Sequence, residues 1–262
     1  MHARELRMRG VVTSTFGVGA DFDERLLRDM AHEGGGNFYF IEGASQIPEL
    51  LTSELGEAAE VTVRDAQVSV SVPRGAEVEV LNRFRSAVDP ETHDLTVQLG
   101  DLVSSQEVTV VTRVTFPSGS VGARTSIRVT ASGRDDDVAR ASDDLEWTYA
   151  SHADNDAQPR EREVDRAVAA VYAARARAEA TEANRFGDLA GARRVIERTA
   201  ARIRRYAGGD AELEGIVDGL ERAVPEYGEM VMPASALKAS FFVAENLQKS
   251  RMATGRAGRR AP

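Results

Sequence analysis

The spacing of hydrophobic residues changes twice along the chain, which predicts three regions of different structure. Up to about residue 60, short apolar runs flank one stretch of helical spacing. From Val61 the apolar residues fall on every second position, as in half-buried strands, and after residue 159 they recur every three or four positions, as in amphipathic helices. We therefore expect a multidomain α+β protein.

The first region is predicted to form a strand, a helix and a second strand. Val11–Phe16 is β-branched and is followed by glycines, as is typical of a buried parallel strand. The next helix has an apolar stripe, made of Phe22, Leu26, Leu27 and Met30. The triple glycine Gly34–Gly36 ends this helix, and Asn37–Ile41 follows as the second strand. A unit of this length predicts a right-handed crossover in a parallel sheet.

The run Thr15–Ile41, TFGVGADFDERLLRDMAHEGGGNFYFI, resembles the last third of a bacterial von Willebrand factor type A (VWA) domain. Gly43–Leu55 resembles the closing helix of that domain, so the resemblance covers about residues 1–60. It implies a doubly wound α/β fold, which in complete domains carries a metal-ion-dependent adhesion site beginning with D-x-S-x-S. This sequence contains no D-x-S-x-S. We therefore expect residues 1–60 to be a C-terminal fragment of such a domain, truncated so that the adhesion site would lie upstream of Met1.

The other two regions predict a β-sandwich and a helical domain. Residues 61–150 contain short alternating strands separated by turn signals, which favours an antiparallel, immunoglobulin-like sandwich with the sole tryptophan, Trp147, in its core. A polar linker, residues 151–158, leads to helices over residues 159–250, with Asp210 capping the third helix and Pro225 interrupting it. The helical pair around Gly187 resembles a tetratricopeptide (TPR) hairpin. The basic tail, residues 251–262, is expected to be disordered. This order of regions resembles the C-terminal half of some bacterial VWA proteins.

Composition narrows the classes of function. The net charge of −9 argues against a general nucleic-acid or anionic-membrane binder. There is no cysteine, and the four histidines are dispersed, so we expect no disulfide, no bound metal and no cofactor. No apolar run is long enough to span a membrane, and no signal peptide precedes the first strand, which favours a cytoplasmic protein.

Candidate binding residues follow the first strand. Gly17 and Gly19 invite a dinucleotide-binding interpretation, but that pattern requires a third glycine where Phe22 stands. Asp21 and Asp23 place negative charge at a helix N-terminus, which is our preferred interpretation; in the VWA resemblance these four residues would lie on the binding rim. No nucleophile motif occurs, and the exposed arginines of the helical region are predicted to form a solvated face.

We therefore expect a non-enzymatic scaffold that binds other proteins. Two alternatives remain open: a metal-dependent adhesion or enzyme-associated module whose functional part lies upstream of Met1, and a helical adaptor that binds peptides through residues 159–250.

Overall fold

The computed structural model describes residues 2–134 and 141–259. The chain divides into two compact units. The α/β-helical unit contains Met1–Ala59, Glu107–Thr109 and Arg162–Pro262, and the β unit contains Glu60–Gln106 and Val110–Glu161. The sequence placed residues 1–60 and 159–250 in separate domains, whereas the structure groups them in one unit.

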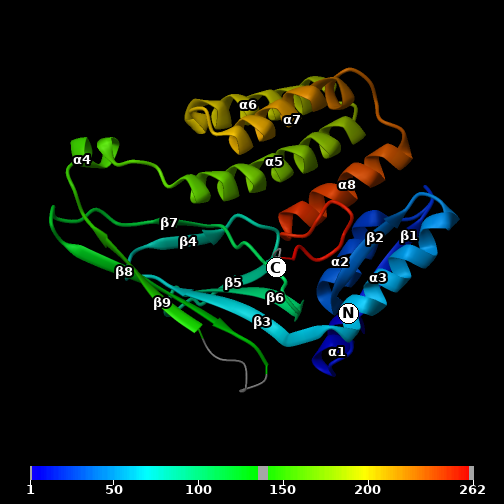
Figure 1. The fold of residues 1–262 in the computed structure, drawn as a ribbon, viewed down its shortest axis with the longest axis horizontal. Coiled ribbons are helices and arrows are strands. Elements are labelled where there is room, and N and C mark those ends of the chain that lie inside the picture. Colours follow the sequence, from blue (N-terminus) through cyan, green and yellow to red (C-terminus); the bar gives the residue numbers. More distant parts are fainter. Residues whose placement is uncertain (1, 135–140, 260–262) are drawn as a thin grey trace. The chain divides into compact units, whose positions relative to one another are not determined.

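The first 59 residues form two parallel strands with helices on both faces (Figure 1). Their elements are α1 (His2–Met8), β1 (Thr13–Val18), α2 (Glu24–Gly34), β2 (Gly35–Ile41), the short 3-10 helix η1 (Ala44–Gln46) and α3 (Ile47–Ala59). Gly35 ends α2 with a φ of 69°, a left-handed conformation that glycine adopts without strain. The predicted strand–helix–strand order and the parallel pairing of the two strands are confirmed.

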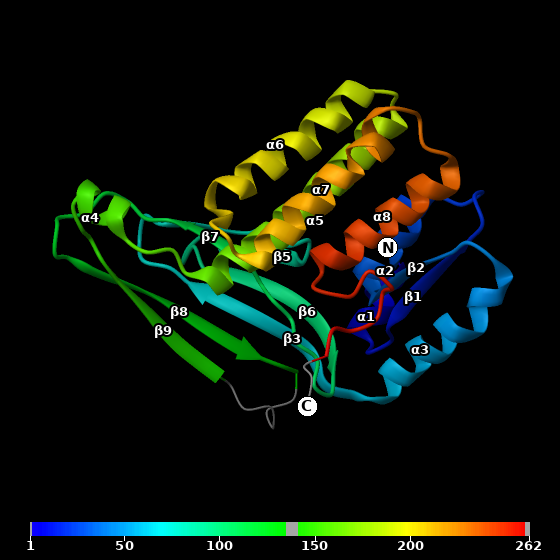
Figure 2. The same ribbon diagram turned by 45° about the horizontal axis from the view of Figure 1, so that its top comes forward.

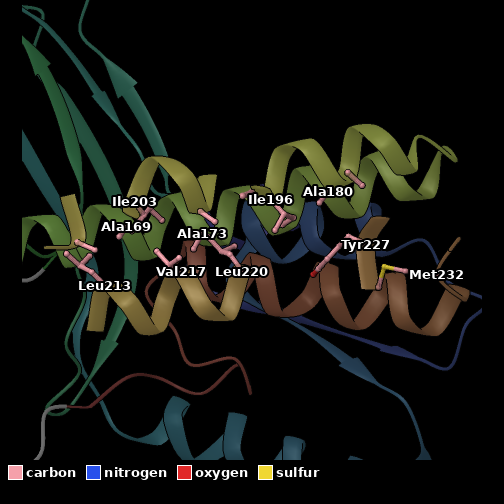
Figure 3. Close-up of a cluster of buried hydrophobic side chains, with 14 of the residues drawn as sticks. Ala169, Ala173, Ala180, Ile196, Ile203, Leu213, Val217, Leu220, Tyr227 and Met232 are labelled. Atoms are coloured by element: carbon pink, nitrogen blue, oxygen red, sulfur yellow. The ribbon is translucent and has the colours of Figure 1, made fainter. Parts of the chain in front are cut away.

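Four long helices complete this unit: α5 (Arg162–Arg185), α6 (Leu189–Ala207), α7 (Ala211–Gly228) and α8 (Ala234–Gln248). Figure 3 shows Ile196, Ile203 and Leu220 pointing between the helices, where alanines of α5 meet them. Asp210 caps α7 as predicted, but Pro225 does not interrupt the helix. It lies in the last turn, which still forms because Tyr227 is anchored in the core and Glu229 donates its N–H to the Pro225 carbonyl at 3.2 Å.

Aromatic side chains join α8 to β2. Phe38 of β2 lies 6.3 Å from Phe241 and 6.1 Å from Phe242, ring centroid to ring centroid, in edge-to-face geometry. Tyr39 lies 6.2 Å from Phe242. Both ribbon views accordingly show α8 beside β2 (Figures 1 and 2). Residues from opposite ends of the sequence thus share one hydrophobic core, which explains why they form one unit.

The predicted disordered tail is instead a small hairpin over residues 251–258; residues 260–262 lie outside the described part of the chain. Arg251 bridges Ala257, and Met252 donates its N–H to the Arg256 carbonyl at 3.0 Å. Glu57 of α3 accepts from both Arg251 Nη2 (2.7 Å) and the Ala257 N–H (2.8 Å). Basic composition indicated a solvated tail, but the acidic residues that hold it come from a helix nearly 200 positions earlier.

The β unit contains two antiparallel sheets. The larger sheet has the order β5-β6-β3-β8-β9, and the smaller pairs β4 with β7. The strands are β3 (Val61–Ser71), β4 (Glu77–Val80), β5 (Arg85–Val88), β6 (Leu95–Val103), β7 (Thr112–Thr115), β8 (Arg124–Ser132) and β9 (Ala141–Thr148). Val70, Leu95, Val97 and Ile127 of the large sheet form a core against which Val78, Val80 and Val114 of the small sheet pack. Residues 135–140, within the predicted sandwich, lie outside the described residues.

Three features of the β unit differ from the sequence-based predictions. β5 does not follow the alternating pattern, because it spans four residues with one large apolar side chain. Trp147 was expected in the core but is 40% exposed, because it lies on the edge strand β9 with Phe116 as its aromatic neighbour, 5.4 Å away. The predicted polar linker contains the short helix α4 (His152–Ala157), which Ser151 caps.

The shared aromatic core predicts that a mutation in β2 will destabilise the distant helices. Phe38→Ala should lower the free energy of unfolding of the α/β-helical unit by about 3–5 kcal/mol. Urea unfolding followed by helical circular dichroism should show this shift, whereas the fluorescence of Trp147, in the β unit, should keep its midpoint. Phe186→Ala is the matched control, because Phe186 is 77% exposed and its removal should change stability by less than about 0.5 kcal/mol. An unchanged helical midpoint in Phe38→Ala would contradict the shared core.

Candidate functional site

The four predicted rim residues lie at the carboxyl end of β1, but the structure gives them different roles. Gly17 is buried, and a Cβ there would lie 2.3 Å from the Phe22 ring, so this glycine allows close packing of the loop. Gly19 has a φ of 71°, which makes the turn into α2. Asp21 is exposed. The phenyl ring therefore occupies the space under Gly17 that a dinucleotide-binding interpretation would leave open.

Asp23 is the N-cap of α2, which confirms the interpretation of its charge. Its carboxylate accepts from the N–H groups of Arg25 (2.9 Å) and Leu26 (3.0 Å). The hydrogen bond from Leu26 does most to hold the pKa of Asp23 below its usual value. Asp23 thus fixes the start of α2 and places the following residue, Glu24, inside the unit.

A buried ion pair beneath this rim was not predicted. Glu24 and Lys238 are 4% and 5% exposed, and Lys238 Nζ lies 2.6 Å from Glu24 Oε2. Nζ also donates to the Phe22 carbonyl at 2.5 Å and lies 4.2 Å from the centroid of the Phe22 ring. Burial raises the pKa of Glu24, but the hydrogen bond from Lys238 and the charge of Arg185 bring it below its usual value. A lysine in the apolar stripe of α8, between Leu237 and Phe241, was the available sequence signal for a buried partner.

The ion pair extends into a network that ties α2 to α5. Arg185 Nη2 lies 2.5 Å from Glu24 Oε1, and Arg185 also lies within ion-pair distance of Glu182. Arg25 pairs with Glu182 in turn. Three basic side chains therefore surround two acidic ones around the start of α2, which favours a structural role over a reactive one.

The opposite face of the two-stranded sheet carries a second polar cluster, centred on Glu54 of α3. Its carboxylate accepts from Tyr39 Oη (2.5 Å), Asn37 Nδ2 (3.2 Å) and Ser14 Oγ. Burial, and then the charge of Glu54, raise the pKa of the Tyr39 hydroxyl far above its usual value. Tyr39 is therefore a permanent hydrogen-bond donor to Glu54 at physiological pH, and this cluster fixes α3 against the sheet.

One edge of β1 is open. Within the described residues, β1 pairs with β2 alone. The Gly19 N–H donates to the Ile41 carbonyl of β2 at 2.9 Å. Because successive N–H groups along a strand point to opposite edges, the N–H groups of Phe16 and Val18 point away from β2. These groups are available to a further strand.

The elements around β1 expose several large apolar side chains. Thr15 Oγ1 bonds to the Leu27 carbonyl of α2 and Ser14 Oγ to Glu54 of α3, so the two helices cover opposite faces of β1. α2 exposes Leu26 and Met30, and α3 exposes Leu51 and Leu55, each pair one helical turn apart. Val11 and Val12 before β1 and Val18 at its end are exposed as well. Leu26 and Met30 were expected to face inward. They are exposed because Leu27 and Ala31 occupy the face of α2 that meets the core.

The described residues contain no group of three histidine, aspartate or glutamate side chains placed to hold a metal ion. No helix in the described part of the chain is long and apolar enough to cross a membrane.

Comparison with known proteins shows which structures this fold resembles. No family model matches the sequence, and neither does any curated protein. A von Willebrand factor type A protein from Catenulispora acidiphila is similar in structure, with a TM-score of 0.57 and 15% identity over 94% of this chain and 58% of that chain. The ArnB paralog VWA2 from Sulfolobus acidocaldarius is also similar, with a TM-score of 0.50 and 16% identity over 89% of this chain and 55% of that one.

The chain therefore has a VWA-like fold and spans less than two thirds of the length of these two proteins. The structural similarity extends well beyond residues 1–60, where the sequence resemblance lies.

Removing the amine of the buried ion pair tests its role. Lys238→Met should lower the free energy of unfolding by about 3 kcal/mol at pH 7, because Glu24 would stay buried with Arg185 alone. In the wild type the pKa of Glu24 is depressed, so its stabilising contribution is present above about pH 4.5 and is lost as the pH falls further. In the variant, burial would raise the pKa of Glu24, so the stability gap to the wild type should narrow between pH 7 and pH 4.

Urea unfolding at several pH values measures this gap. Arg256→Met is the control, because its pair with Glu49 is exposed and its loss should cost less than about 1 kcal/mol at every pH. A gap that stays constant from pH 7 to pH 4 would show that Glu24 does not carry the effect.

Proposed function

We propose that this chain is a non-enzymatic protein-interaction scaffold, formed by the C-terminal part of a bacterial VWA protein. Its α/β piece is completed along β1 by a further parallel strand from another polypeptide segment. The similarity to longer VWA proteins supports this proposal, because the chain corresponds to 58% and 55% of their lengths. In the same proposal, the β unit is an immunoglobulin-like sandwich and the α5–α6 pair is a TPR-like hairpin.

The open edge of β1 is the observation that carries the proposal. A two-stranded sheet is marginal by itself, and parallel sheets normally have neighbours and helices over both faces. Here α2 and α3 already cover the two faces of β1, and both helices expose leucine side chains. An added strand would use the free N–H groups of Phe16 and Val18, and its flanking apolar residues would cover these leucines.

The buried charges support a role without catalysis. Glu24 is neutralised by Lys238 and Arg185, and Glu54 is occupied by three hydrogen bonds from the sheet. A general acid or base must reach a substrate and exchange a proton near the working pH. The depressed pKa of Glu24 and its burial are unfavourable for both.

Hydrogen exchange at single amides tests the open edge. In the chain alone, the amides of Phe16 and Val18 should exchange at least about tenfold faster than those of Gly17 and Gly19, because only the latter point to β2. Nuclear magnetic resonance resolves these four amides, and Gly17 and Gly19 are the internal controls. Equal protection of all four amides in a monomer would mean that the edge is already closed.

A proline at the edge tests the added strand directly. Val18→Pro removes an N–H that points away from β2, so the β1–β2 bonds and the helical circular dichroism should be retained. The variant should lose strand addition, whereas Val18→Thr should keep it. The measurement compares hydrogen exchange at Phe16 in the chain alone and in the chain with its added strand. The added strand comes from the upstream coding segment, expressed in frame, where the gene has one, and otherwise from a co-purified partner. Slower exchange at Phe16 in both variants, or in neither, would contradict the proposal.

A further inference from the structure

Helix α6 carries six arginines and one glutamate, and four of the arginines form a continuous line. Arg194, Arg198, Arg202 and Arg205 are exposed and are separated by four, four and three residues. At about 100° and 1.5 Å per residue, they occupy an arc of about 80° and a length of about 16 Å. We call these four residues the arginine ridge.

The arginine ridge lies opposite the buried face of α6. Ile196, Ala200 and Ile203 point into the helical core, as Figure 3 shows for the two isoleucines. By the same helical geometry, these three residues centre about 170° away from the ridge. The ridge therefore faces solvent within this unit, and no apolar packing requires its charges.

The remaining arginines of α6 are neutralised, whereas the ridge is not. Arg193 pairs with Glu197 at 2.8 Å, and Arg204 pairs with Glu221 of α7 at 2.6 Å. Within the described residues, Arg194, Arg198 and Arg205 form no hydrogen bond or ion pair. The helix thus separates its arginines into a paired side next to α7 and an unpaired side.

The fourth arginine of the ridge is held in place by an aromatic ring. The guanidinium of Arg202 lies 4.8 Å from the centroid of the Tyr172 ring of α5, and Arg175 lies 6.0 Å from the same ring. A cation–π contact restricts the side chain but leaves its N–H donors free. Arg202 can therefore bind a carboxylate while losing less conformational entropy than a free arginine would.

We propose that the arginine ridge binds an acidic segment of another protein, with glutamate or aspartate side chains spaced by one helical turn. The line of guanidiniums matches such carboxylates in spacing and charge, and arginine binds carboxylates through two parallel hydrogen bonds. Nucleic acid fits less well, because the ridge of about 16 Å is short for the several phosphate contacts that such binding requires. Exposed ion pairs are individually weak, so the interaction depends on several carboxylates acting together and is sensitive to salt.

The test uses the full chain and a fluorescently labelled helical peptide that carries a glutamate every third or fourth residue. Fluorescence anisotropy should show binding that weakens as salt rises from about 0.05 to 0.5 M. A peptide with glutamine at the same positions should not bind. The triple variant Arg194→Gln, Arg198→Gln, Arg205→Gln should weaken binding about tenfold or more, from the loss of three pairs.

The control variant changes the net charge equally on the other side of the helix pair. Arg193→Gln, Arg204→Gln, Arg222→Gln removes three exposed arginines outside the ridge and should change binding less than about threefold. Equal weakening by both triple variants would overturn the proposal, because it would show attraction to overall charge alone. Absence of peptide binding, or tighter binding of a labelled single-stranded oligonucleotide, would also overturn it. The strand-addition variant Val18→Pro should keep peptide binding, which separates this proposal from the scaffold function.

Discussion

The packing of β2 against α8 holds the α/β-helical unit together. Two parallel strands and three helices cannot enclose a core of their own, and here Phe241 and Phe242 supply the missing apolar surface to Phe38 and Tyr39. The C-terminal hairpin depends on the same contact, because Gly255 lies against the rings of Tyr39 and Phe242 where a larger residue would clash. The orientation of α8 thus decides whether the first 59 residues are ordered.

The ion pair between Glu24 and Lys238 fixes the position of α8 along β2. Aromatic surfaces tolerate small rotations and shifts, whereas a buried carboxylate and amine must meet at one place. Lys238 and Phe241 lie one turn apart on α8, so a shift of α8 along β2 would separate the charges before it removed the ring contacts. Glu54 and its three donors fix α3 on the opposite face in a similar way. These polar contacts therefore fix the positions of α8 and α3 on the sheet, and apolar contacts supply most of the stability.

Local signals in the sequence predicted most of the α/β piece and the helices. Glycines mark the ends of β1 and α2, and Asp23 and Asp210 cap helices as their positions indicated. The errors concern long-range contacts. Spacing cannot reveal that Glu57 binds Arg251, or that the edge position of β9 leaves Trp147 exposed. The spacing of apolar residues also could not predict that Leu26 and Met30 are exposed, because an apolar stripe does not specify which of its residues meet a core. Among the four rim residues, Asp23 caps α2, Gly17 and Gly19 allow the turn into that helix, and Asp21 is exposed.

The order of segments in the chain also affects how the protein folds during synthesis. About 200 residues separate Phe40 from Phe241, and the whole β unit is translated between them. At about 5–20 residues per second, β2 leaves the ribosome roughly 10–40 s before α8 does. Throughout that interval the phenyl rings of β2 lack the cover that α8 supplies, while the antiparallel sheets can already fold from contiguous sequence. Residues 1–59 are therefore the part of the nascent chain most prone to aggregation, and chaperone binding to them would be most useful before the last helix is made.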